Sequence, residues 1–115
     1  MGKKFHEELK ILMDEFVHLV YDMSLAFPKE EQFGVTSQLR RASLSIILNY
    51  IEGFARQRNL VLKNFLEISY GSLKETKYLL YFSYRRKYID KENYQKSLVM
   101  AERIGKMLWG ILRNL

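Results

Sequence analysis

Apolar residues recur at steps of three and four positions along four long stretches of this chain. That spacing places them on one face of an α-helix, so it predicts a bundle of helices. The first helix is expected from about Lys4 to Ala26. Its predicted core face comprises Phe5, Leu9, Leu12, Phe16, Leu19, Met23 and Ala26. The opposite face is charged and is expected to be solvated.

The second stretch begins at Val35 and carries a polar stripe beside its apolar face. The apolar face comprises Val35, Leu39, Ala42, Ile46, Tyr50 and Phe54. The polar stripe comprises Gln38, Arg41, Ser45, Asn49, Glu52 and Arg56. Much of the remaining circumference is apolar, with Leu44, Ile47, Leu48 and Ile51. A helix that is apolar on nearly all sides is normally buried, and buried polar groups need partners. We therefore expect other helices, or other copies of the chain, to enclose the stripe, and we assign Gln38, Arg41, Ser45, Asn49 and Glu52 to an oligomer interface. Alternatively, the stripe is the solvated face of a monomer.

Turn signals separate the helices. Phe27-Pro28 ends the first one, because the residue before proline avoids the α region. Asn59 is expected to cap a third helix that runs to about Tyr88, and Asp90 a fourth. The third helix is expected to pack through Leu62, Phe65, Leu66, Ile68 and Leu73, beside a stripe of small residues, Ser69, Ser72 and Thr76. The fourth is expected to pack through Tyr94, Leu98, Ala101, Gly105, Leu108, Leu112 and Leu115. The expected fold is an all-α, up-down-up-down antiparallel four-helix bundle forming one domain over residues 1–115.

The composition argues against several classes of function. There are no cysteines, which excludes disulfides and thiolate chemistry. The two histidines, His6 and His18, point in different directions on one helix, so we expect no metal site and no cofactor. Neither a glycine-rich phosphate loop nor a nucleophile motif occurs, and we expect no enzymatic activity. No apolar run is long enough for a membrane span and no secretory leader is evident, so a cytoplasmic location is expected.

Charge is unevenly distributed along the chain. Residues 1–31 carry four lysines against seven acidic residues, a net charge of −3, whereas residues 32–115 carry fifteen basic residues against six acidic ones, a net charge of +9. This asymmetry indicates either a polyanionic partner or self-association between unlike surfaces. It does not decide between them.

Residues 74–91 combine basic and aromatic side chains, which bind phosphates and stack on unpaired bases. The candidate nucleic-acid-binding residues are Arg40, Arg56, Arg58, Lys63, Lys74, Lys77, Tyr81, Tyr84, Arg85, Arg86 and Lys87. Alternatively, the tyrosines pack between subunits or on the fourth helix while the charges extend into water. Two functions therefore stay open. One is a nucleic-acid-binding accessory protein, for RNA or DNA. The other is a homo-oligomeric structural or protein-interaction module that makes no direct contact with nucleic acid.

Three blocks of sequence carry a family resemblance. They are FPKEEQFGVTSQLRRASLSI followed by Asn49 and Glu52-Gly53-Phe54, then Phe65–Ile68 with Gly71–Glu75, then Ile104–Leu108 with Gly110. From about Val20 onward the chain resembles the bacterial four-helix bundle proteins, also called 23S rRNA intervening sequence proteins. It departs from their pattern at Ile47 and Leu48, where a proline and an alanine are usual, so the second helix should run without a kink. The tryptophan usual near the N-terminus is absent, and the only one here is Trp109.

The resemblance carries expectations about assembly. The family is similar to the accessory variability proteins of diversity-generating retroelements, which form basic pentameric barrels that engage RNA and a reverse transcriptase. It therefore implies a ring-shaped homo-oligomer, a pentamer by analogy. It also implies a connection to nucleic acid, and a reverse transcriptase or another protein as a candidate partner.

Overall fold

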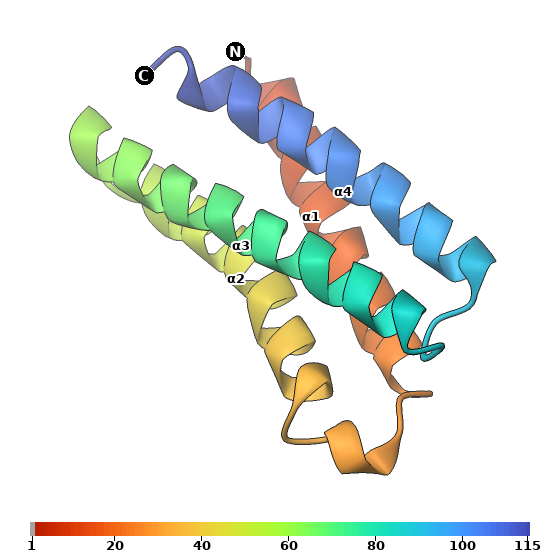
Figure 1. Cartoon of the computed structure of the whole chain (residues 1–115). Helices are drawn as coiled ribbons and strands as arrows, with labels where there is room; N and C mark the ends of the chain where they lie inside the picture. Colours follow the sequence, from red (N-terminus) through yellow and green to blue (C-terminus); the bar gives the residue numbers. More distant parts are fainter. Residues whose placement is uncertain (1) are drawn as a thin grey trace.

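The computed structural model describes residues 2–115, which form four α-helices and one short 3-10 turn. The elements are α1 (Lys3–Ser24), η1 (Lys29–Glu31), α2 (Val35–Phe54), α3 (Asn59–Arg85) and α4 (Lys91–Leu112). Consecutive helices run antiparallel (Figure 1), and each packs on two neighbours: α1 and α3 both contact α2 and α4. The prediction of an all-α, four-helix bundle is confirmed. No described helix is both long and apolar enough to cross a membrane.

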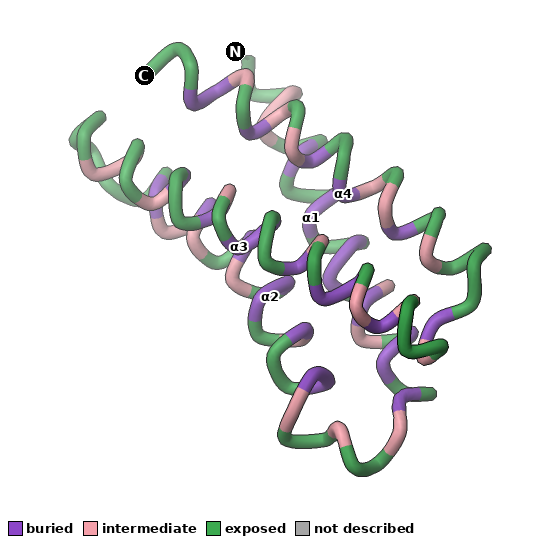
Figure 2. The backbone as a smooth tube through the Cα atoms, in the orientation of Figure 1, coloured by how far each residue is buried: buried purple, intermediate pink, exposed green. Residues whose placement is uncertain are grey.

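The core lies along the centre of the bundle, and all four helices carry buried residues, drawn in purple in Figure 2. Fully buried side chains come from every helix, including Phe16, Leu39, Leu80 and Leu108. Most predicted core positions are confirmed as buried or half-buried. The exceptions, all more than a third exposed, are Ala26, Phe54, Ile68 and Leu115. Ala26 and Leu115 lie beyond the last residues of their helices, where the helical period no longer applies.

Two predicted helix boundaries are wrong by a few residues. Asn59 is not a cap but the first residue of α3, and no side chain caps this helix. The third helix ends at Arg85 rather than Tyr88, because Lys87 adopts a left-handed conformation with φ of 66°. The amide of Tyr88 then donates to the Ser83 carbonyl, and that of Lys87 to the Tyr84 carbonyl, which closes the helix end. At α4 the predicted cap is confirmed, since the Asn93 amide donates to Asp90 Oδ1 at 2.7 Å.

The connection between α1 and α2 is held by Glu31. Its Oε1 accepts from the Val35 amide at 3.3 Å, at the start of α2, and its Oε2 accepts from the Tyr88 hydroxyl at 2.9 Å. A Cβ at Gly34 would meet Glu31 Oε1 at 2.6 Å, so a larger residue there would displace this carboxylate. α2 then runs without interruption to Phe54, as the replacement of proline by Ile47 predicts.

α2 and α3 form the most extensive helix pair. The Ser69 hydroxyl donates to the Ile46 carbonyl at 2.7 Å, and the hydroxyls of Ser45 and Ser72 lie 2.9 Å apart. Gly53 is a point of close approach, since a Cβ there would lie 3.0 Å from Phe65 Cβ. The predicted stripe of small residues on α3 is therefore confirmed as the surface that lets α2 approach.

Candidate nucleic-acid interface

The predicted nucleic-acid-binding residues do not form one patch. α3 has 27 residues and therefore spans about 40 Å. One group, Arg56, Arg58 and Lys63, lies at the end of the bundle where α2 connects to α3. Another group, Arg85–Lys87, lies at the opposite end of α3. The predicted residues are thus spread along the whole length of α3 rather than gathered in one place.

Three of the predicted cations already have partners within the chain, and one of them, Arg56, pairs with Glu52. Arg40 donates from Nε to the Ser24 hydroxyl at 2.7 Å, and its guanidinium lies 5.0 Å from the Tyr21 ring centroid. It therefore joins α2 to α1, away from α3. The Lys77 ammonium lies 2.5 Å from Glu102 Oε1 on α4, and the lysine side chain is 23% exposed. Arg40 and Lys77 are consequently less available to a ligand than the sequence indicates.

Exposed aromatic and basic side chains do meet near the C-terminal end of α3. Tyr78 and Tyr81 are 61% and 43% exposed, and they line a shallow cavity of about 270 Å³ with Phe82, Arg85 and Arg86. Arg85 Nη1 donates to the Tyr81 hydroxyl at 3.0 Å, and this bond raises the pKa of the guanidinium. Arg85, Arg86 and Lys87 are all exposed. This end of α3 offers phosphate-binding groups beside an aromatic surface.

Tyr84 is placed differently from Tyr81. Its ring stacks on Tyr94 of α4 with centroids 4.5 Å apart and an interplanar angle of 6°, and it is only half exposed. For this tyrosine the structure matches the alternative of packing on the fourth helix.

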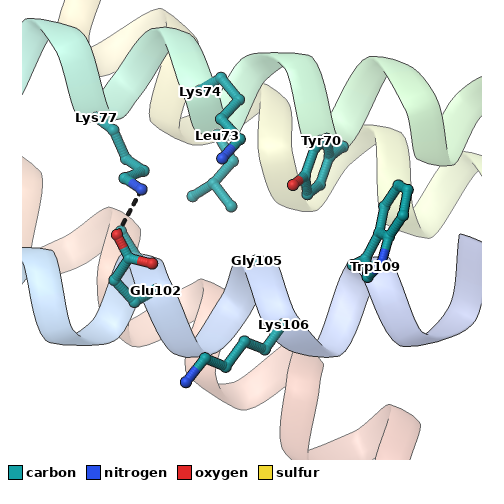
Figure 3. Close-up of a pocket in the computed structure, with 9 residues that line it drawn as sticks. Tyr70, Leu73, Lys74, Lys77, Glu102, Gly105, Lys106 and Trp109 are labelled. Atoms are coloured by element: carbon teal, nitrogen blue, oxygen red, sulfur yellow. Dashed lines mark hydrogen bonds and ion pairs between the residues drawn. The ribbon is translucent and has the colours of Figure 1, made fainter.

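A groove between α3 and α4 brings two predicted residues, Lys74 and Lys77, together with others that the sequence did not single out. Tyr70, Lys74 and Lys77 come from α3, and Glu102, Lys106 and Trp109 come from α4 (Figure 3). The Tyr70 and Trp109 rings lie at one end with centroids 6.0 Å apart, and Lys77 and Glu102 pair across the other end. The cavity between them has a volume of about 160 Å³, with Leu73, Ala101 and Gly105 completing its lining.

Electrostatics in this groove favour anions. The Lys77 hydrogen bond and charge, with further charge from Lys74 and Lys106, lower the pKa of Glu102, so this carboxyl is ionised at neutral pH. Lys74 and Lys106 make no ion pair within residues 2–115. The three lysines therefore leave a positive excess around one carboxylate.

Tyr70, Lys106 and Trp109 were missed because two helices form the groove together. The signal was present as Tyr70 and Lys74 four residues apart, and Lys106 and Trp109 three apart, each pair on one helix face. Nothing in either pair alone shows that α3 and α4 bring them to the same groove.

The polar stripe of α2 finds partners within the chain. Arg41 Nη2 lies 2.5 Å from Glu75 Oε2 on α3, Ser45 meets Ser72, and Asn49 Nδ2 donates to the Ser45 carbonyl at 2.9 Å. Glu52 pairs with Arg56, two residues beyond the end of α2. α3 therefore covers part of this stripe, while Gln38 and Arg41 remain exposed. The assignment of the stripe to an oligomer interface stays a prediction.

The sequence predicts that α2 is buried on nearly all sides, and within a single chain this prediction is wrong. Leu44, Leu48 and Ile51 are 37%, 53% and 50% exposed, and Ile68 of α3 is 45% exposed. These residues point away from the core, because α1 and α3 contact the other sides of α2. We refer to Leu44, Leu48 and Ile51 as the apolar face of α2.

The histidines occupy separate environments. His6 Nδ1 lies 2.5 Å from the Tyr50 hydroxyl, whereas His18 is exposed with Nε2 3.5 Å from Asp14 Oδ1. Within residues 2–115, no cluster of three His, Cys, Asp or Glu residues has a geometry suited to a metal ion.

Comparison with known proteins places this fold. A crystal structure from Bacteroides thetaiotaomicron, of a protein with unknown function from the S23 ribosomal protein family, superposes with a TM-score of 0.87. It is 25% identical, and the match covers 95% of this chain and 98% of that one. No curated protein matches significantly. The model of the 23S rRNA-intervening sequence proteins matches residues 8–110, so the chain belongs to the 23S rRNA-intervening sequence protein family.

Proposed function

We propose that this protein is a non-enzymatic accessory protein that binds nucleic acid, with RNA as the principal target. The observation that carries the proposal is the run Arg85–Lys87 at the end of α3. These are three consecutive exposed cations with no ion pair inside the described chain, and two of them, Arg85 and Arg86, line a cavity with the exposed Tyr81. Such a surface releases counterions from phosphates and offers a ring to bases.

The charge of the surrounding helices supports this reading. Residues 59–115, which include α3 and α4, carry eleven basic residues against five acidic ones, a net charge of +6. The sequence contains no base-reading motif such as a zinc finger or an aromatic RNA-binding strand. Phosphate contacts should therefore dominate, and binding should show little sequence preference.

The test is fluorescence anisotropy with labelled single-stranded RNA, structured RNA and duplex DNA at two salt concentrations. Affinity should fall steeply with salt, and replacing Arg85, Arg86 and Lys87 with Gln should reduce the salt slope by about one per lost contact. A matched control replaces Lys3, Lys4 and Lys29, exposed cations of the acidic N-terminal part, and should leave the slope nearly unchanged. Absence of binding to all three probes at low salt would refute the proposal.

A second candidate function is favoured by the apolar face of α2. Three large apolar side chains at helical spacing, exposed on one helix, are typical of a surface that another molecule covers. We propose a second copy of the chain as the occupant, and a ring-shaped pentamer as the assembly that the family resemblance implies. The two functions are compatible, because a ring would present the same basic surface several times to one strand.

A further inference from the structure

We infer that the groove between α3 and α4 holds one unpaired nucleotide of a single-stranded nucleic acid. The base would lie on Trp109, and the flanking phosphates on Lys74 and Lys106. This inference rests on the proposed function and adds a defined subsite to it. It uses residues away from Arg85–Lys87, so the two can be tested separately.

Trp109 supplies the stacking surface. It is 54% exposed, and its ring is tilted by 39° against that of Tyr70, so the two rings do not cover each other face to face. An indole with an open face binds any base, because every base presents a π-face. Figure 3 shows both rings at the same end of the groove.

The two helices approach each other closely beside these rings. Gly105 lies one helical turn before Trp109, and a Cβ there would lie 3.2 Å from Leu73 Cδ2. The glycine therefore lets α4 approach α3, and the Leu73 side chain lies against it. With Leu73 and Ala101 it provides an apolar floor next to the aromatic end.

Lys74 and Lys106 supply the positive charge. The Lys74 ammonium lies 5.2 Å from the centroid of the Tyr70 ring, beside the aromatic end, and Lys106 lines the groove from α4. Lys77 neutralises Glu102, which would otherwise repel a phosphate. The groove thus combines an exposed ring, an apolar floor and two lysines that make no ion pair among residues 2–115. This combination suits a ligand that has both a planar ring and adjacent negative charge.

This combination selects unpaired nucleotides. Bases in a duplex are covered by their neighbours in the stack, and a base reaches an aromatic side chain only after unstacking. Phosphate contacts alone do not make this distinction. An acidic peptide supplies the charge but not the ring.

Because Trp109 is the only tryptophan in the chain, its fluorescence reports directly on this site. The experiment titrates the protein with a single-stranded RNA of about 12 nucleotides, the same backbone without bases, the matched duplex and polyglutamate. Anisotropy of each labelled probe is recorded in parallel. We expect quenching by the single strand, and little by the other three probes even where anisotropy shows that they bind.

Variants separate the subsite from the remaining surface. Trp109→Leu should weaken single-strand binding about tenfold and leave duplex binding unchanged, whereas Trp109→Phe should retain most of the affinity. Val99→Leu, at another exposed apolar position of α4, is the control and should change neither. Circular dichroism melts confirm that each variant is folded.

Glu102→Gln adds a gain-of-function arm. It should tighten single-strand binding because it releases Lys77 and removes the one carboxylate that lines the groove among residues 2–115. Binding of single strands without tryptophan quenching, or an equal loss of single-strand and duplex binding in Trp109→Leu, would overturn the subsite and leave the proposed function standing. Equal quenching by polyglutamate would assign the groove to acidic peptides instead. Absence of binding in every anisotropy titration would overturn both.

Discussion

The Tyr50 hydroxyl and His6 Nδ1 lie 2.5 Å apart, although 44 residues separate them in the chain. Tyr50 is 1% exposed, and burial raises the pKa of its phenol, so the hydroxyl remains a donor at neutral pH. The contact fastens the beginning of α1 to the C-terminal half of α2, where Phe54 also packs on the imidazole with ring centroids 4.7 Å apart.

Removing this hydroxyl should weaken the fold. Tyr50→Phe is expected to lower the free energy of unfolding by about 1 kcal/mol, since it deletes one hydrogen bond without changing the packing. Urea denaturation followed by circular dichroism measures the change. Tyr78→Phe, at a 61% exposed position, is the control and should have no effect. Equal stability of the two variants would show that the Tyr50–His6 bond contributes nothing.

The same histidine should make stability depend on pH. Burial, aided by the positive charge of Lys10, lowers the pKa of His6 below its ordinary value of 6.5. Just below that value, the unfolded chain takes up a proton that the folded chain does not. Stability should therefore be full above about pH 7 and should decrease as the pH falls through 6.5 towards the lowered folded pKa.

Melting temperatures at about pH 7.5 and about pH 5.5 test this expectation. His6→Gln should reduce the difference between the two temperatures. His18→Gln should preserve it, because His18 lies on the exposed side of α1. A difference unchanged by His6→Gln would assign the pH dependence to other groups.

Two glycines in helices should respond oppositely to alanine. Gly71→Ala should stabilise the protein by about 0.5–1 kcal/mol, because nothing lies within 4 Å of the added Cβ and alanine favours the helix. At Gly53 the new Cβ would press on Phe65 Cβ at 3.0 Å, an atom that moves only with its backbone. Gly53→Ala should therefore destabilise by about 1–3 kcal/mol, as overpacking does. Chemical denaturation measures the free energy of unfolding of both variants. If both substitutions stabilise the protein, α2 and α3 do not approach closely at Gly53.

Charge placed on the apolar face of α2 should disrupt self-association. Leu48→Glu is expected to shift the protein towards smaller species in native mass spectrometry and light scattering, while its helical signal remains unchanged. Val99→Glu introduces the same charge at a 69% exposed position of α4 and should leave the assembly intact. A parent protein that is monomeric at micromolar concentration would eliminate this surface as a self-association site.

Features that depend on a single helix, such as its buried face and its cap, could be predicted from the sequence. Phe16, Leu39 and Leu108 follow the helical period and are fully buried, and Asp90 caps α4 as its residue type suggests. Errors arose where the neighbours of a helix decide the outcome. The period alone could not show that α3 covers the polar stripe rather than the apolar face, so Leu48 was expected inside.

The candidate site shows the same difference between features of one helix and features that two helices form together. Arg85–Lys87 could be found because they are adjacent in sequence. The groove of Tyr70 and Trp109 could not, because the two rings lie on different helices and meet only through the register of α3 against α4. The hydrogen bond from Arg40 to Ser24 could not be predicted either, because Ser24 belongs to α1.

Lys87 occupies a left-handed position that usually belongs to glycine, at the point where the chain leaves α3. A glycine there would adopt this conformation more readily, so Lys87→Gly should raise the melting temperature. The same change removes one of the three cations proposed to contact phosphate, so it should also reduce the salt slope of binding. A screen for higher thermostability would therefore favour Lys87→Gly, although this variant binds nucleic acid less tightly. Optimising the stability of this protein at Lys87 would weaken the activity that we propose for it.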